Sequence, residues 1–324
     1  MNIFIKKLGS NESGYSGDKP NQRGKFILIP SNSLSTFPPL SNSTLNDNTI
    51  IRFRLLSGEE IATNIVYHNA KFFPDHYRKH NEVRLYRNTA LDNALKLDRN
   101  VIVVIVQLEL QLYGIASIQP NDKDYPKFEN LQGNRVNSAE NLEEINLIQD
   151  LINLKNYSFS SVTNEREVIE FASKRYREAR TQQPAAQGDP GVIFSALINN
   201  QDKFKDFVRQ AYDNKCALRG SSLIKNNAIG CEAAHIQPAS HNGPLLPTNG
   251  ILLSADLHKC FDSGLITLSD RGRVIVSKNI PNGSEIHSFD GKLITPSTGW
   301  EIYKPYSKYC DYNRTNVFER RFEN

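Results

Sequence analysis

Residues 231–236 read CEAAHI and residues 252–262 read LLSADLHKCFD, so one histidine lies near the end of the first stretch and another inside the second. We interpret the first stretch as a short β-strand that ends just before Pro238. Alternation along a strand places Glu232 and Ala234 on one face and His235 on the other. His235 then stands at the strand's end, where its side chain can face the second stretch.

The second stretch predicts a compact helix, with Ser254 as its N-cap and Gly264 just beyond its end. His258 and Asp262 are four residues apart, so their side chains share one face of that helix. An imidazole and a carboxylate together suit a divalent ion that keeps positions open for phosphate oxygens and water. The helix is therefore a candidate metal-binding element, with His235 across from it.

A loop rich in Pro, Gly and Asn, QPASHNGPLLPTNG at 237–250, leads from the strand to a second short apolar strand, ILL. The loop delivers Asn249 and Gly250 to the start of that strand. His241 lies within the loop and is either a substrate contact or a solvent-exposed residue. A lone histidine beside a strand is more often structural, but this ordered set of strand, loop, strand and helix indicates a functional site.

This arrangement resembles the HNH nucleases, which carry a ββα-metal finger. His235, Asn249 and His258 take the places of the family's His, Asn and His, at steps of 14 and 9 residues. FVRQAYDNKCALRG at 207–220 and NGILLSADLHKCFDSG at 249–264 are similar to one branch of that family. The resemblance implies that His235 activates the attacking water, that Asn249 holds the loop and orients this base, and that His258 binds Mg²⁺ or Mn²⁺.

Two positions depart from the family pattern. Many members place Asp or His immediately before the first His as a metal ligand, whereas Ala234 cannot coordinate an ion. Asp262 is the candidate to complete the ion's shell, and Glu232 is a second candidate. Arg219 stands where Thr is common before Gly220, and we expect it only to alter a turn.

The first 120 residues alternate short apolar runs with turn residues and predict a β-rich domain. NEVRLYRN at 81–88 predicts an edge-like strand. VIVVIVQLELQLYGIASI at 101–118 predicts a buried strand at the centre of the sheet. A short helix is predicted around 89–97.

This front segment resembles the EcoRII-type effector domain, a DNA-binding pseudobarrel akin to the plant B-three fold. The likeness lies in Asn11, Gly14 and Gly17 ahead of a polar arm, and in a second arm, HYRKHNEVRLYRN at 76–88. It implies two arms that grip the major groove with side chains suited to base edges. For each residue, a phosphate contact or a plain surface charge is the alternative. The candidate DNA-binding residues are Lys19, Asn21, Gln22 and Arg23, and Arg78, Lys79, Glu82 and Arg84.

The middle of the chain predicts a polar loop at 121–135, a helix beginning near Ser138 and a second, charged helix at 164–180. We predict an α+β protein of three parts. These are a β-pseudobarrel DNA-recognition domain at 1–135, a helical connector at 136–190 and an HNH nuclease domain at 191–324.

The composition is that of a soluble globular protein, with 39% hydrophobic and 23% charged residues. Residues 1–100 hold 14 Lys and Arg against 9 Asp and Glu, which fits phosphate contact or a solvated surface equally well. The four cysteines form no CxxC pair, so reduced thiols and a cytoplasmic location are expected. No apolar run predicts a signal peptide or a membrane span.

These features together predict a restriction-type endonuclease that binds double-stranded DNA. Cleavage of both strands would need two protomers or two visits, so a homodimer is expected. A modification-dependent nuclease is the nearest alternative, and the sequence does not separate the two. A DNA-binding regulator with an inactive finger is another alternative, which the alanine at position 234 keeps open.

Overall fold

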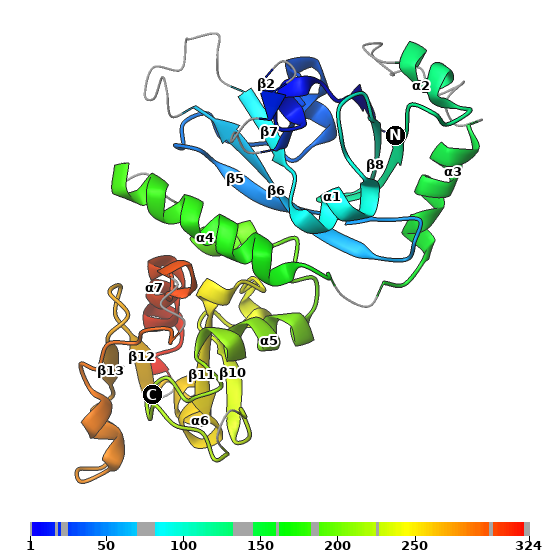
Figure 1. Cartoon of the computed structure of the whole chain (residues 1–324). Helices are drawn as coiled ribbons and strands as arrows, with labels where there is room; N and C mark the ends of the chain where they lie inside the picture. Colours follow the sequence, from blue (N-terminus) through cyan, green and yellow to red (C-terminus); the bar gives the residue numbers. More distant parts are fainter. Residues whose placement is uncertain are drawn as a thin grey trace. The chain divides into compact units, whose positions relative to one another are not determined.

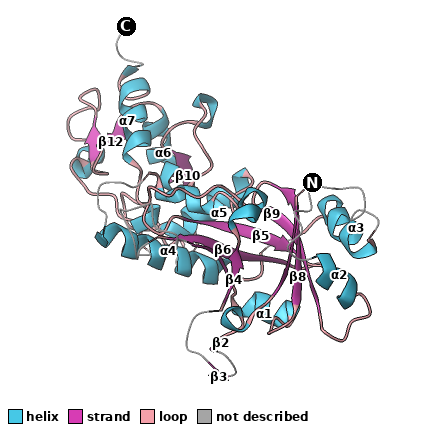
Figure 2. Cartoon of the chain, turned by 90° about the horizontal axis from the view of Figure 1, so that it is seen from above, coloured by secondary structure: helices cyan, strands magenta, loops and turns pink. Residues whose placement is uncertain are grey.

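The computed structural model divides the chain into two compact units, Met1–Gln187 and Gly188–Asn324. It describes residues 2–16, 19–20, 25–69, 82–131, 145–159, 162–182, 188–224, 227–297 and 301–320. The protein is α+β, as predicted, with a curled sheet in the first unit and short strands among helices in the second (Figures 1 and 2). The domain boundaries near residues 135 and 190 stay predictions.

The first unit is built on a seven-stranded sheet in the order β1-β8-β9-β5-β6-β7-β4. Neighbouring strands are antiparallel except β5 and β9, which run parallel. A separate hairpin joins β2 (Tyr15–Ser16) to β3 (Lys19–Pro20). The sheet strands are β1 (Ile3–Lys7), β4 (Phe26–Ile29), β5 (Asn48–Arg54), β6 (Glu60–His68), β7 (Glu82–Tyr86), β8 (Ile102–Glu109) and β9 (Leu112–Ile118).

The two edge strands of this sheet, β1 and β4, are joined by side chains. Lys6 of β1 donates to the backbone oxygen of Leu28 in β4 at 2.8 Å. Glu12 accepts from the backbone nitrogen of Leu28 at 2.8 Å and pairs with Lys6 at 2.8 Å. The sheet therefore curls until its edges meet, which gives the predicted pseudobarrel.

Strand β8 is buried on both faces. Val103 and Ile105 belong to the core inside the curl, while Ile102, Val104 and Val106 pack in a second core with α2 and α3. Figure 2 shows α2 (Tyr125–Leu131) and α3 (Asn146–Asn153) beside this strand. Burial on two faces explains the unbroken apolar run in the sequence.

Three strand predictions were wrong in detail. The run at 101–118 forms two strands that turn at Gln111, whose φ is 61°. Neither lies at the centre of the sheet, which is β5, because the apolar run reflects two covered faces rather than a central place. The strand predicted at the edge, β7, lies between β6 and β4.

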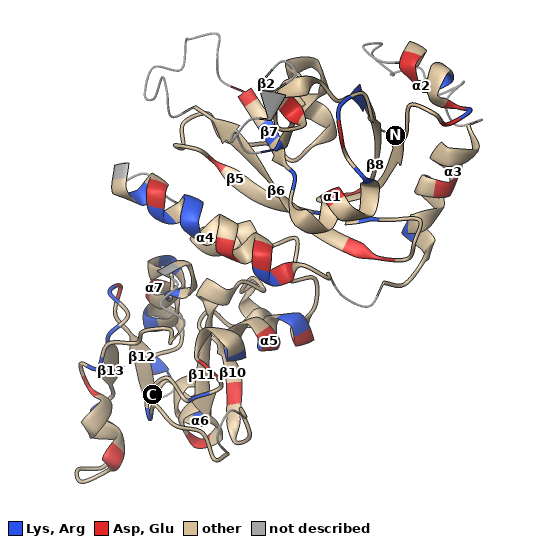
Figure 3. Ribbon diagram, viewed as in Figure 1, with Lys and Arg blue, Asp and Glu red and all other residues tan. Residues whose placement is uncertain are grey.

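The helices of the first unit were predicted unevenly. Helix α1 (Thr89–Leu95) confirms the prediction at 89–97, and Asn88 caps it by accepting from the nitrogen of Leu91. The predicted loop at 121–135 contains α2, because Phe128 is fully buried against the sheet. The predicted start at Ser138 lies outside the described residues. Helix α4 (Glu165–Gln182) carries both signs of charge along its length (Figure 3).

The second unit packs short strands between helices. Its elements are α5 (Gln201–Ala211), β10 (Cys231–His235), β11 (Gly250–Ser254), α6 (Ala255–Asp262), β12 (Ile266–Leu268), β13 (Val274–Val276) and α7 (Ser307–Asn316). Phe204 and Phe207 of α5 are fully buried in its core. Across the described ranges of both units, no helix has the length and apolar character needed to cross a bilayer.

Candidate active site

Strands β10 and β11 with helix α6 form one compact ββα unit, as predicted. The strands are antiparallel, with His235 opposite Gly250 and Ala234 opposite Ile251. Helix α6 follows β11 without an intervening loop. Ala234 is fully buried, so this position points into the core and supplies no ligand.

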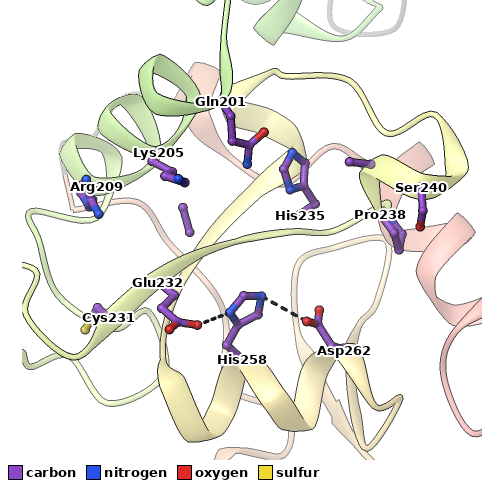
Figure 4. Close-up of a pocket in the computed structure, with 12 residues that line it drawn as sticks. Gln201, Lys205, Arg209, Cys231, Glu232, His235, Pro238, Ser240, His258 and Asp262 are labelled. Atoms are coloured by element: carbon purple, nitrogen blue, oxygen red, sulfur yellow. Dashed lines mark hydrogen bonds and ion pairs between the residues drawn. The ribbon is translucent and has the colours of Figure 1, made fainter.

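A pocket of about 640 Å³ opens on this unit, and both candidate histidines line it (Figure 4). His235 comes from β10, and His258 and Asp262 come from α6. Helix α5 contributes a further wall. The lining residues are Gln201, Lys205, Arg209, Cys231, Glu232, Ala233, His235, Pro238, Ala239, Ser240, His258 and Asp262.

His258 lies between two carboxylates. Its Nδ1 is 2.6 Å from Oε2 of Glu232, and its Nε2 is 3.4 Å from Oδ2 of Asp262. Alternation along β10 predicted Glu232 and His235 on opposite faces, yet both line the same pocket. Two-stranded ribbons twist strongly, which allows residues three apart at a strand end to reach one site.

His258 Nε2 faces Asp262, whereas Glu232 bonds to the other ring nitrogen of His258, so the three side chains do not converge on one ion position. Among the described residues, no group of three or more His, Cys, Asp or Glu side chains is placed to hold a metal ion. Mg²⁺ is usually held by one or two carboxylates together with substrate phosphate and water. Glu232 and Asp262 are 56% and 57% exposed in their side chains, so their oxygens remain accessible beside His258.

His235 is held by an aromatic stack. Its ring lies on that of Phe204 with centroids 4.2 Å apart and planes inclined by 13°. Its Nε2 is buried and, within the described part of the chain, has no hydrogen-bond partner. Burial lowers the pKa of His235, nearby His258 lowers it further, and Asp262 opposes this. The imidazole is therefore neutral at pH 7 and able to accept a proton.

Asn249 fixes the loop that follows His235. Its side-chain oxygen accepts from the backbone nitrogen of Gln237 at 2.8 Å. Its side-chain nitrogen donates to the oxygens of Gln237 and Pro244, at 3.1 and 3.0 Å. The backbone oxygen of Asn249 also accepts from Ile236. These bonds tie Asn249 to both ends of the loop, while its role in orienting His235 stays a prediction.

The comparison with protein-family models matches this segment. Residues 216–269 match the model described as HNH endonuclease. We refer to this segment of the second unit as the HNH domain because of its similarity to that model. The match covers β10, β11 and α6 and leaves α5 and α7 outside it. No curated protein sequence matches the chain.

Solved structures that are similar to parts of the chain include three from different proteins. The "Arabidopsis FUS3-DNA complex" has 14% identity and a TM-score of 0.27, covering 36% of this chain and 95% of that one. The "Modification dependent TagI restriction endonuclease" has 18% identity and a TM-score of 0.28, covering 41% and 44%. The "N-terminal domain of Helicobacter pylori LlaJI.R1" has 11% identity and a TM-score of 0.27, covering 40% and 98%.

Arg219 does more than alter a turn, contrary to the prediction. Its guanidinium pairs with both oxygens of Asp256 at 2.7 Å, and also contacts Ser254 and Glu285. Arg219 holds the pKa of Asp256 well below its ordinary value. Because Asp256 lies in the first turn of α6, Arg219 fixes the helix that carries His258 in the HNH domain.

Two residues that bind the backbone or side chains next to His235 and Asn249 were not predicted from the sequence. Asn313 of α7 donates to the backbone oxygen of Ile236 at 2.8 Å, directly after His235. Asp189 accepts from Thr248, next to Asn249, at 2.7 Å. These contacts join residues far apart in the sequence, so no local sequence pattern predicts them. Lys205 and Arg209 of α5 have a signal in the sequence, because their four-residue spacing places both on one face of the helix.

The candidate DNA-binding residues of the first unit are only partly described. Asn21, Gln22, Arg23, Arg78 and Lys79 lie outside the described residues, as does the side chain of Lys19. Glu82 and Arg84 lie on β7 and pair with each other. The Arg84 guanidinium also stacks over Phe26, 4.2 Å from the ring centroid. Their DNA contacts stay predictions.

Proposed function

We propose that the protein is an endonuclease that hydrolyses phosphodiester bonds of double-stranded DNA at sites selected by its first unit. One observation carries the proposal: His235 lines the same pocket as the linked Glu232, His258 and Asp262, within a segment that matches an HNH endonuclease model. A base and a metal-binding group in one open pocket form the minimum set for metal-assisted hydrolysis.

Each side chain has a distinct role in this proposal. The neutral His235 takes the proton of the attacking water, and the Phe204 ring restricts its orientation. Asn249 maintains the loop after this base. His258 and Asp262, with Glu232 beside them, would hold a divalent ion, Mg²⁺ or Mn²⁺. When bound, such an ion supplies stabilisation of negative charge on the phosphate and the leaving oxygen.

The first unit is proposed to read the duplex. Glu82 and Arg84 of the second predicted arm are among the side chains that would face the bases, together with the other residues of the two arms. A single HNH site cuts one strand, so we propose that two copies act together on a duplex.

The test is cleavage of paired unmodified and cytosine-methylated phage DNAs with Mg²⁺, Mn²⁺ or chelator, comparing the wild type with His235→Ala. We expect discrete fragments that require metal, and a loss of about 10²- to 10⁴-fold in the variant, as is typical when a general base is removed. Binding of the same DNA, followed by anisotropy, should change by less than about twofold because an uncharged side chain is removed outside the recognition unit.

The outcomes separate the alternatives. Fragments from methylated DNA alone would identify a modification-dependent nuclease. Retained binding without cleavage of either DNA would overturn the proposal and favour an inactive DNA-binding regulator. An equal loss of binding and cleavage in His235→Ala would contradict its role as a base.

A further inference from the structure

Helix α5 presents three polar side chains to the active-site pocket. Gln201, Lys205 and Arg209 line it together with His235 (Figure 4). They are four residues apart, so they form one stripe with steps of about 6 Å along the helix axis. The buried side chains of this helix, Phe204 and Phe207 among them, lie on a different face.

The packing of α5 fixes this stripe relative to the candidate base. Phe204 stacks on His235, as described above. A Cβ added at Gly250 would lie 2.3 Å from Cγ2 of Val208 and 3.2 Å from the ring of Phe204. Only glycine permits so close an approach of β11 to the helix. The packing therefore fixes the position of helix α5, which carries the two cations, relative to His235.

Lys205 and Arg209 each form a weak ion pair within helix α5. Lys205 pairs with Asp202 at 3.2 Å and Arg209 with Asp206 at 3.4 Å, each within the helix. The two cationic side chains are 41% and 40% exposed. Exposed pairs of this kind contribute little, so exchange of a carboxylate for a phosphate costs little.

The positive and the negative side chains of the pocket come from different helices and strands. The cations come from α5, whereas Glu232 and Asp262 flank His258 on the other side of the pocket (Figure 4). In the same view Gln201 is the member of the stripe nearest to His235. A strand whose reacting phosphate lies between the two histidines can thus continue along α5.

We infer that Lys205 and Arg209 bind two successive phosphates next to the reacting one, so that α5 guides the cleaved strand past His235. This inference rests on the proposed nuclease function. Both residues lie outside the segment that matches the HNH model, so they are a feature of this chain's own architecture. Lys205 and Arg209 act here as substrate-positioning residues and take no part in proton transfer.

The first experiment compares Lys205→Gln and Arg209→Gln with a matched control, Lys203→Gln. Lys203 is on the same helix but does not line the pocket. We expect kcat/KM for supercoiled plasmid nicking to fall about 10- to 100-fold in each pocket variant, as for lost charge-assisted contacts. The slope of log kcat/KM against log salt should decrease by about one per removed cation. The control should stay within about twofold of the wild type.

The second experiment uses synthetic duplexes across a mapped cut site, each with one neutral methylphosphonate. In the wild type, neutralising either contacted phosphate should slow cleavage. In Lys205→Gln, neutralising the partner phosphate of that lysine should have no further effect, while the other position still responds. Equal sensitivity of wild type and variant at every phosphate would overturn the inference.

Failure of this inference can be distinguished from failure of the proposed nuclease function. If the wild type cuts and the two pocket variants behave like Lys203→Gln, the inference fails and the nuclease function stands. If the wild type cuts no DNA with any metal, the proposed function fails and takes the inference with it. Circular dichroism and thermal unfolding of each variant exclude loss of the fold as the cause.

Discussion

Charged side chains are used differently in the two units. In the first unit, the side chain of Arg87 is fully buried and bonds to Asp92 and to the backbone oxygens of Glu12 and Leu97. Glu60, also buried, joins Arg52 and Arg54. In the second unit, the carboxylates around the pocket are more than half exposed. A charge whose partners are all protein groups fixes the fold, whereas an exposed charge in a pocket stays available to a ligand.

The largest effect is expected from a comparison of two Glu→Gln substitutions, one at a buried and one at an exposed carboxylate. Glu60→Gln leaves two largely buried guanidinium groups without their carboxylate, at 2.8 and 3.1 Å in the wild type. We expect the free energy of unfolding of the first unit to fall by about 3–5 kcal/mol. Glu232→Gln should change the stability of the second unit by less than about 0.5 kcal/mol but slow cleavage. Urea unfolding and plasmid nicking measure the two effects, and similar stability losses would contradict the contrast.

Arg84 is intermediate in exposure between the buried Arg87 and the exposed carboxylates of the pocket. Its side chain is 29% exposed, pairs with Glu82 and stacks on Phe26. We expect Arg84→Ala to weaken specific DNA binding by about 1–3 kcal/mol while non-specific nicking continues. Anisotropy on cognate and scrambled duplexes measures this. An equal loss on every sequence would assign Arg84 to phosphate contact, and loss of stability alone would place it with Arg87.

The smallest expected effect is in the pH dependence of cleavage. The pKa of His235 lies below the ordinary 6.5, because of burial and of nearby His258. The base is active when neutral, so the rate should hold from pH 8 to 6.5 and fall only at lower pH. A pH–rate profile of kcat/KM checks this, with the fold monitored at each pH. A midpoint above 6.5 would show that His235 is stabilised as a cation.

Local sequence pattern predicted the order of strand, loop, strand and helix, because strand alternation and helix spacing depend on near neighbours. The family resemblance supplied His235, Asn249 and His258, whose roles stay predictions. The same reasoning failed where tertiary structure intervenes. Glu232 lines the pocket although strand alternation predicts the opposite face, and Arg219 binds Glu285, which lies 66 residues away in the sequence. The apolar run at 101–118 showed burial correctly but not strand order, since helices cover the outer face of β8.

The closure of the first sheet limits how a second copy can associate. With Lys6 and Glu12 engaging the backbone of Leu28, β4 is occupied at its outer edge by its own unit. A strand from another molecule would have to displace these bonds before it could extend the sheet. A dimer that acts on DNA is therefore not expected to form by adding a strand at β4.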